Sequence, residues 1–137
     1  DICQDVCPFQ RFASDTNEAA FVPDQTDDAY ERAAPLLSDL LTLDQVTFKQ
    51  HYVGTPLERV KRERLVRNAC IAAGNSADPT LIPYLIQLLY DASVLIRGHA
   101  AWGLWRLMGD GADRLLTDLY DRDDDADVRE EVEALIG

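Results

Sequence analysis

One short pattern, an aliphatic residue followed by arginine at the start of a helix-like stretch, occurs three times in this chain. Arg97 follows Arg67 by 30 residues, and Arg129 follows Arg97 by 32. A period in this range, with a helix in each unit, is typical of helical solenoids. We therefore expect the three arginines to occupy one equivalent place in each repeat. For Arg97 and Arg129 the structural interpretation is a bond to the capping Asp of a neighbouring turn.

The clearest repeat contains one long helix between Asp91 and Gly109. Asp91 and Ser93 are residue types that cap the first turn of a helix. Apolar or small residues then recur at three- and four-residue spacing, which places them on one face. They are Ile96, Ala100, Gly103, Leu104 and Leu107. Gly109 stands where a helix often ends in a left-handed residue. The pattern predicts a buried central helix.

The rest of the chain reads as a short cysteine-bearing segment (1–12), a polar loop (13–29) and further helices (30–137). Apolar periodicity and capping residues predict the helices of this third part. Their expected ranges are 30–41, 43–52, 58–73, 81–90, 115–120 and 128–136. Pro35 is expected to start or kink the first, and Gly74 with Asn75 to end the third.

The spacing D…[VI]R…A…L…G resembles the HEAT repeat, a family of stacked helical hairpins. The unit of the central helix matches it at Asp91, Ile96, Arg97, Ala100, Leu104 and Gly109, and the last unit at Val128, Arg129, Val132 and Gly137. The unit of Arg67 departs from it, since Gly74 stands where Leu104 does. The resemblance implies an all-α, HEAT-like solenoid of helical hairpins.

Charge is unevenly distributed along the chain. The net charge is −12, with eleven acids in 109–137 and eight in 14–44. By itself this balance argues against nucleic acid and anionic membranes as partners. One basic segment interrupts it, formed by Arg59, Lys61, Arg62, Arg64 and Arg67. That segment is either a solvated helix face or a binding site for an anion.

The three cysteines are Cys3, Cys7 and Cys70. An odd count favours a reducing cytoplasm over a disulfide framework. Cys70 lies among apolar residues and is expected in the core. No run of about 18 apolar residues exists, so we expect no membrane span. Because the chain opens with Asp1 inside a cysteine motif, we expect it to be the tail of a longer protein.

Cys3 and Cys7 form the motif C-x₃-C-P with Pro8. Bacterial-type ferredoxin motifs end in this way, and thiolates are the usual ligands of iron–sulfur clusters. Two unrelated free thiols would give the same spacing. The motif and the truncated start together favour an iron–sulfur origin, with Cys3 and Cys7 as metal ligands.

Four segments together resemble the C-terminal part of the epoxyqueuosine reductase family, over nearly the whole chain. They are DICQDVCPFQRF, Phe21-Val22-Pro23, FKQHYVGTPLERVKRERLVRNACIAAGN and IRGHAAWGLWRL. The third is the most specific, because it joins Gly54-Thr55-Pro56, the basic segment and Arg67-Asn68 in order.

The resemblance implies an iron–sulfur and cobalamin enzyme that completes queuosine in tRNA. Cys3 and Cys7 would ligate a [4Fe-4S] cluster, while an upstream region would hold the cobalamin and reduce the epoxide. The present chain would hold tRNA without being catalytic itself, as a cytoplasmic monomer. The expected tRNA-binding residues are Arg59, Lys61, Arg62, Arg64, Arg67, Arg97 and His99. The alternative is a stand-alone HEAT-repeat module that binds a basic protein.

Some polar and aromatic residues have a structural interpretation beside the functional one. His99 is expected either to support the helix or to contact RNA. Trp102 and Trp105 are expected to pack, with one of them available for stacking on a base. The acidic run 121–127 lacks the spacing of a calcium loop and is expected to be a solvated turn.

Overall fold

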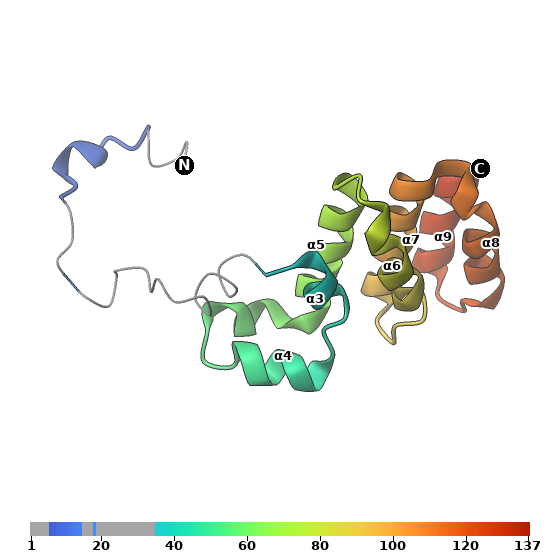
Figure 1. Ribbon diagram of the computed structural model, residues 1–137, viewed down its shortest axis with the longest axis horizontal. Coiled ribbons are helices and arrows are strands. Elements are labelled where there is room, and N and C mark those ends of the chain that lie inside the picture. The colour runs from blue at the N-terminus through green and yellow to red at the C-terminus, as the bar shows by residue number, and fades with distance from the viewer. Residues whose placement is uncertain (1–5, 15–17, 19–34) are drawn as a thin grey trace. The chain divides into compact units, whose positions relative to one another are not determined.

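The computed structural model describes residues 6–14, 18 and 35–137, which fall into two units, Asp1–Ala34 and Pro35–Gly137 (Figure 1). In the first unit a single turn of 3-10 helix, η1 (Gln10–Phe12), follows Cys7 and Pro8. Cys3, most of the predicted loop 13–29 and the predicted helical residues 30–34 lie outside the described residues.

The second unit is built entirely from helices and turns in the part of the chain that the structure describes. The α-helices are α3 (Leu37–Leu41), α4 (Gln45–Tyr52), α5 (Lys61–Asn75), α6 (Ile82–Leu88), α7 (Val94–Met108), α8 (Asp113–Arg122) and α9 (Ala126–Ile136). Short 3-10 turns connect them at η3 (Pro56–Val60), η4 (Pro79–Leu81) and η5 (Gly109–Ala112). The expected all-α fold is confirmed.

The helices form a stack with α3 and α4 at one end of this unit and α8 and α9 at the other, where α9 lies between α7 and α8 (Figure 1). The central helix α7 packs against α5, α6 and α9, so it lies in the middle of the stack. None of the described helices combines the length and apolar character that a membrane span requires.

The core follows the repeat seen in the sequence. Val66, Ile96 and Val128, the aliphatic residues before the three repeated arginines, are all essentially inaccessible to solvent. Cys70 is also fully buried, as expected, and this burial raises the pKa of its thiol to about 12. The 30- and 32-residue period therefore marks equivalent core positions in successive units.

Two predicted helices differ from the helices observed. The predicted helix 58–73 is divided by Lys61, whose φ of 64° separates η3 from α5. In the predicted helix 30–41, Pro35 and Leu36 are non-helical and α3 begins at Leu37, so Pro35 precedes the helix and does not lie within it. Proline has no amide hydrogen for a bond within a helix, which agrees with this position.

Asn75 ends α5, as expected, and Gly74 just before it lies where α5 meets α7. A Cβ atom on Gly74 would approach Trp102 Cζ3 to 2.8 Å, and one on Gly103 would approach the Cys70 carbonyl oxygen to 3.0 Å. The two helices therefore come together through glycines, because any larger residue would meet side chain or backbone of the other helix.

We predict that Gly103→Ala destabilises the chain by about 1–3 kcal/mol, since the new methyl group would push α7 away from the Cys70 carbonyl. The matched control is Gly98→Ala in the same helix, where the nearest atom would be Glu131 Cγ at 4.0 Å. There the higher helix propensity of alanine should stabilise the chain by up to about 1 kcal/mol. Denaturant unfolding of both variants tests this; equal effects would contradict the close approach.

Candidate nucleic-acid interface

Arg62, in the first turn of α5, links three parts of the chain. Its Nε donates to the Leu43 carbonyl at 2.7 Å, and its Nη2 and Nη1 lie 2.5 and 3.3 Å from the two carboxylate oxygens of Asp91. Asp91 lies in the turn before α7 and also accepts from the Ser93 amide at 2.9 Å. All three guanidinium nitrogens of Arg62 are therefore used within the chain.

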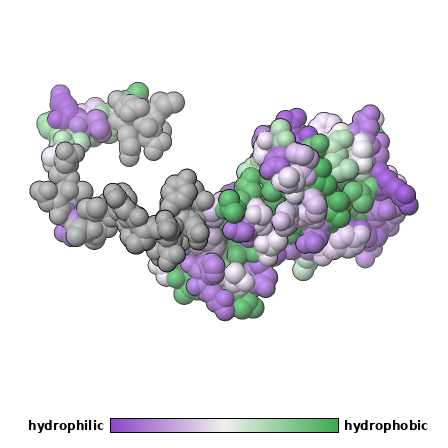
Figure 2. Space-filling view, in the orientation of Figure 1, coloured by the Kyte–Doolittle hydropathy of each residue, from purple (hydrophilic) through white to green (hydrophobic). Residues whose placement is uncertain are grey.

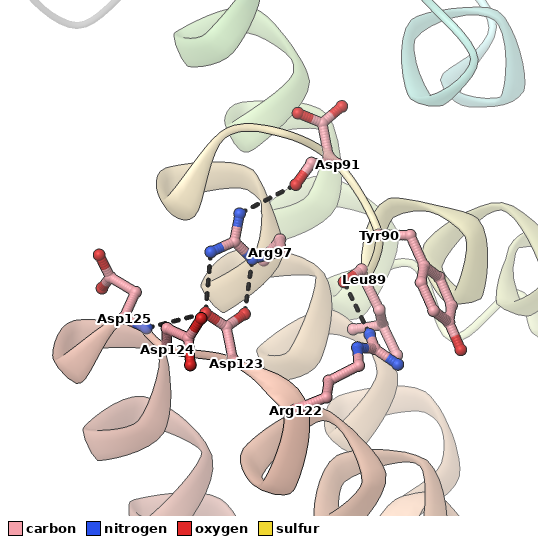
Figure 3. A pocket seen from close by; sticks show the side chains of 8 residues that line it. All are labelled: Leu89, Tyr90, Asp91, Arg97, Arg122, Asp123, Asp124 and Asp125. Carbon is pink, nitrogen blue, oxygen red and sulfur yellow. Dashed lines mark hydrogen bonds and ion pairs between the residues drawn. The ribbon is translucent and has the colours of Figure 1, made fainter.

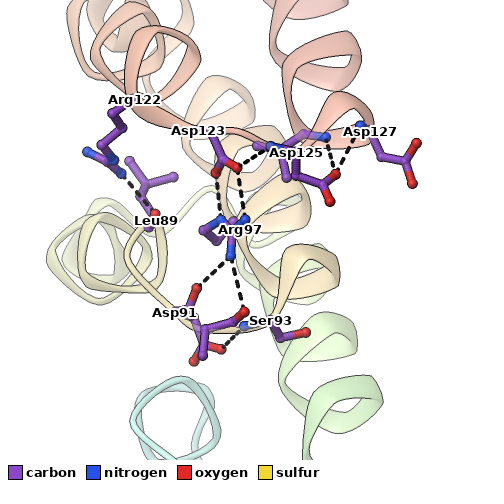
Figure 4. A network of polar contacts seen from close by, with 10 residues as sticks. Leu89, Asp91, Ser93, Arg97, Arg122, Asp123, Asp125 and Asp127 are labelled. Atoms are coloured by element: carbon purple, nitrogen blue, oxygen red, sulfur yellow. Dashed lines mark hydrogen bonds and ion pairs between the residues drawn. The ribbon is translucent and has the colours of Figure 1, made fainter.

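Arg97 repeats this arrangement one unit later (Figure 4). Its Nε and Nη2 donate to the carboxylate of Asp123 at 2.6 and 2.9 Å, and its Nη1 donates to the carbonyls of Asp91 and Ala92. Asp123 lies in the turn before α9, with its side chain 5% exposed. The side chain of Arg97 thus links the turn before α7 to the turn before α9.

These contacts shift the acidity of the groups involved. The hydrogen bond from Arg97 lowers the pKa of Asp123 and raises that of Arg97. Burial alone would raise the pKa of Asp91, but the hydrogen bonds from Arg62 and Ser93 outweigh it and leave that pKa below its usual value. The charged form of both carboxylates is therefore favoured in the folded chain.

The structure confirms the structural interpretation of Arg97, which pairs with Asp123 in a neighbouring turn. In α5 the corresponding bond is made by Arg62 and not by Arg67. Arg129 instead lies over the Tyr120 ring at 4.7 Å. The expectation of a fully solvated turn at 121–127 is wrong at Asp123, because this carboxylate is buried against Arg97.

The remaining cations of the basic segment point to solvent. Arg59, Lys61 and Arg64 are exposed, and none of them forms an ion pair with a carboxylate of the described residues. Glu58, next to Arg59, accepts instead from the Gly54 amide at 2.9 Å. Together with the half-buried Arg67, these cations form what we call the α5 basic face.

The neighbouring face of α7 carries aromatic and basic groups. Gly74 of α5 packs on Trp102 and Arg106, and the Arg106 guanidinium lies 5.8 Å from the Trp102 ring centre. His99 is half-buried, with Nδ1 2.9 Å from the Leu95 carbonyl, which leaves Nε2 as its second polar atom. Trp105 packs against the core, as expected. Trp102 and Arg106 therefore lie beside the C-terminal end of α5, whereas His99 lines a hollow together with Asp127 and Glu131 of α9.

The far end of the stack is acidic and hollowed in two places. A hollow of about 490 Å³ is lined by Arg97, Arg122, Tyr90 and the acids 123–125, and Arg122 covers the Tyr90 ring at 3.8 Å (Figure 3). A second hollow, of about 300 Å³, lies between α7 and α9 beside His99. Hydrophilic residues gather at this end (Figure 2). Polyanions would be repelled there and favoured at the α5 basic face.

The sulfur ligands predicted from the cysteine motif are only partly described. Cys7 is a free, half-buried thiol, while Cys3 lies outside the described residues. Within the described part of the chain, no three His, Cys, Asp or Glu residues come together as metal ligands. Cys70 is unsuited to this role because it is buried and its pKa is raised. The half-buried thiol of Cys7 is suitable as one ligand of a cluster, but the described residues do not supply the other ligands.

Comparison with known proteins supports the helical repeat. The family model of HEAT repeats matches residues 58–136. An epoxyqueuosine reductase of Bacillus cereus is 32% identical over 133 residues, covering 96% of this chain and 34% of the relative. One of Pseudomonas aeruginosa is 36% identical over 109 residues, covering 77% and 28%. The chain thus spans about a third of the length of these curated relatives.

Solved structures give the same result. A crystal structure of epoxyqueuosine reductase with an epoxyqueuosine-modified tRNA-Tyr stem loop superposes with a TM-score of 0.82 and 27% identity, over 98% of this chain and 35% of the other. The enzyme from Bacillus subtilis superposes with a TM-score of 0.80 over the same 98%. The expected similarity to epoxyqueuosine reductases is confirmed across nearly the whole chain.

We predict that Arg97→Met destabilises the chain by about 3 kcal/mol, because it leaves the buried Asp123 carboxylate unpaired. Arg114→Met, at an exposed arginine of α8, should change stability by less than about 0.5 kcal/mol. Thermal and denaturant unfolding measure both. Equal stability of the two variants would show that the Arg97–Asp123 pair is not structural.

The same pair predicts a dependence on acid. Since folding lowers the pKa of Asp123, its contribution is complete above about pH 4, the usual value in unfolded chains, and is lost as pH falls through the folded value. Asp123→Asn should therefore lose more stability at pH 6 than at pH 2–3. Urea unfolding across this range tests the sign, and a constant difference would contradict it.

Proposed function

This chain belongs to the HEAT-repeat family, and from that premise we propose that it is the tRNA-holding, C-terminal part of an epoxyqueuosine reductase-like enzyme. The main observation in support is that 98% of the chain superposes on an epoxyqueuosine reductase whose structure was solved with a tRNA stem loop. In this proposal the longer enzyme reduces epoxyqueuosine to queuosine in tRNA, in the cytoplasm and as a monomer. The relatives favour this function over a stand-alone protein-interaction module.

The α5 basic face supports the proposal physically. Lysine and arginine bind RNA mainly by neutralising backbone phosphates, which supplies affinity without sequence preference. Arg59, Lys61 and Arg64 are exposed and free to do so, whereas Arg62 and Arg97 are held by carboxylates of the chain. We therefore propose Arg59, Lys61, Arg64 and Arg67 as the RNA-binding residues and assign Arg62 and Arg97 to the structure, while His99, beside Asp127 and Glu131, is left out of this set.

We also propose that Cys3 and Cys7 are ligands of a [4Fe-4S] cluster and that cobalamin is held by another region of the enzyme. The accessible thiol of Cys7 followed by Pro8 supports the first part. The cluster would supply electrons for the reduction. The role of this chain is then to complete the cluster and to hold the substrate RNA.

We predict that Arg64→Gln weakens binding of a tRNA-Tyr stem loop about fivefold at 0.1 M salt and reduces the slope of log K against log salt by about 0.7–0.9. A variant with one phosphate contact fewer releases fewer counterions when it binds RNA, so its affinity depends less steeply on salt. Fluorescence anisotropy over a salt series measures both quantities, with circular dichroism to confirm that the fold is kept.

The matched control for this measurement is Arg114→Gln, which removes the same charge from the acidic end of the stack. It should leave both affinity and salt slope close to those of the unchanged chain. Equal weakening by the two variants would mean that RNA affinity depends only on the net charge of the chain. The α5 basic face would then not be the RNA-binding site. Arg62 is unsuitable for this test, because its replacement would break the ion pair to Asp91.

We predict that the 137-residue chain, reconstituted anaerobically with iron and sulfide, holds less than one [4Fe-4S] cluster per chain. A cluster takes four cysteine thiolates, and with Cys70 buried the chain offers two thiols for this purpose. Iron and acid-labile sulfide analysis measure the occupancy. Four iron and four sulfide per chain would overturn this ligand assignment.

A further inference from the structure

The hollow between α7 and α9 is a surface that the proposed RNA binding does not use. It has a volume of about 300 Å³. Buried Gly98 and half-buried Val94 and Leu95 give it an apolar part, whereas half-buried His99 and two exposed acids of α9 give it a polar part. None of the residues that line it is a lysine or an arginine, so no cation of the described chain occupies it.

The polar side chains that line this hollow are acceptors of hydrogen bonds. Nδ1 of His99 lies 2.9 Å from the Leu95 carbonyl oxygen. Because a carbonyl oxygen can only accept, Nδ1 carries the hydrogen, and Nε2 of the neutral ring is then an acceptor. The carboxylates of Asp127 and Glu131 also only accept. A ligand that satisfies these groups must therefore bring several donors.

The two carboxylates of the hollow carry charge that the chain does not neutralise. Asp127 and Glu131 are four residues apart on α9, so they share a helix face, where like charges repel each other. Neither of them forms an ion pair within the part of the chain that the structure describes, unlike Asp91 and Asp123. The helix dipole favours Asp127 in the first turn of α9, but Glu131 lies one turn later. The charge of this hollow therefore favours a cation.

The spacing of the acceptors indicates which cation fits. Among the described residues, no three His, Cys, Asp or Glu side chains converge as ligands of one metal ion. A guanidinium group is planar and carries five N–H donors, so it can bond to acceptors that are too far apart for a single ion. The aliphatic stem of an arginine also covers apolar surface. Both parts of the hollow, apolar and acidic, therefore match one arginine side chain.

We propose that this hollow is a docking site for an arginine side chain of a basic protein segment. In this contact the stem lies on Val94, Leu95 and Gly98. The guanidinium donates to the carboxylates of α9 and to Nε2 of His99. The inference goes beyond the proposed function, because it concerns a protein partner at the acidic end of the stack and does not depend on RNA binding.

Short peptides test the chemistry of the occupant. The probe is an alanine tripeptide with a central arginine, blocked at both ends, and it is compared with the same peptide carrying citrulline or lysine. Citrulline keeps the length of the side chain without its charge, and lysine keeps the charge without the planar group. Affinity should fall about tenfold with citrulline and about threefold with lysine.

NMR titration of the 137-residue chain at low salt measures these affinities and locates the contact. The arginine peptide should cause saturable shifts at the amides of Gly98, His99 and Glu131. Shifts confined to other parts of the chain, or equal affinity for arginine and citrulline, would overturn the proposal. Equal affinity for lysine would overturn the assignment to arginine.

A matched pair of variants distinguishes the hollow from the general charge of α9. Glu131→Gln removes a carboxylate that lines the hollow, and Glu130→Gln removes the same charge from an exposed neighbour that does not line it. The arginine peptide should bind Glu131→Gln about fivefold more weakly, and Glu130→Gln less than about twofold more weakly. Equal weakening would show that the peptide responds to the charge of the helix and would overturn the docking site.

The melting temperature of the free chain excludes a structural role for Glu131. Since Asp127 and Glu131 repel each other, Glu131→Gln should leave the melting temperature unchanged or raise it. A lower melting temperature would show that Glu131 stabilises the fold through a partner in the chain, and the proposal would fail.

A tRNA-Tyr stem loop tests RNA as the competing occupant. Phosphates should be repelled by Asp127 and Glu131, so the stem loop should not displace the arginine peptide and should not shift the amide of Gly98. Displacement of the peptide by the stem loop would assign the hollow to the RNA-binding surface and would overturn the protein partner.

Discussion

The stack of helices depends on ion pairs that link one repeat to the next. Arg62 joins α5 to the turn before α7 through Asp91, and Arg97 joins α7 to the turn before α9 through Asp123. Arg97 also holds the backbone of the turn that carries Asp91, so the two links share a turn. Buried pairs of this kind add little net stability but fix relative position, because a shifted helix would leave a charge unpaired.

These links divide chemically identical residues into two groups. The arginines bonded to Asp91 and Asp123 are held in place by these carboxylates, while Arg64 is exposed and Arg67 retains a buried, unpaired Nε. The acids also fall into two groups. Asp123 is buried and paired with Arg97, whereas exposed acids of α8 and α9 give this end of the stack its negative charge. A polyanion is consequently favoured at the α5 basic face and disfavoured at the other end.

Close packing between α5 and α7 supports this arrangement. Gly74 and Gly103 let the two helices approach until Trp102 and the Cys70 carbonyl fill the space where side chains would stand. The polar groups on the two helices are thereby held on one rigid surface. A flexible surface would lose more conformational entropy on binding, so rigid placement favours the RNA binding that we propose.

The sequence by itself determined the fold class, the repeat and the family resemblance. Val66, Ile96 and Val128 recur at the period of a solenoid, and this period depends on apolar burial, which is visible in residue type and spacing. The partner of each arginine was decided by the tertiary structure alone. Arg62 and Asp91 are 29 residues apart, and Arg97 and Asp123 are 26 apart, so only the packing of successive helices brings them together. The spacing of charges along α5 therefore could not show that Arg62 forms an ion pair within the chain and that Arg67 does not.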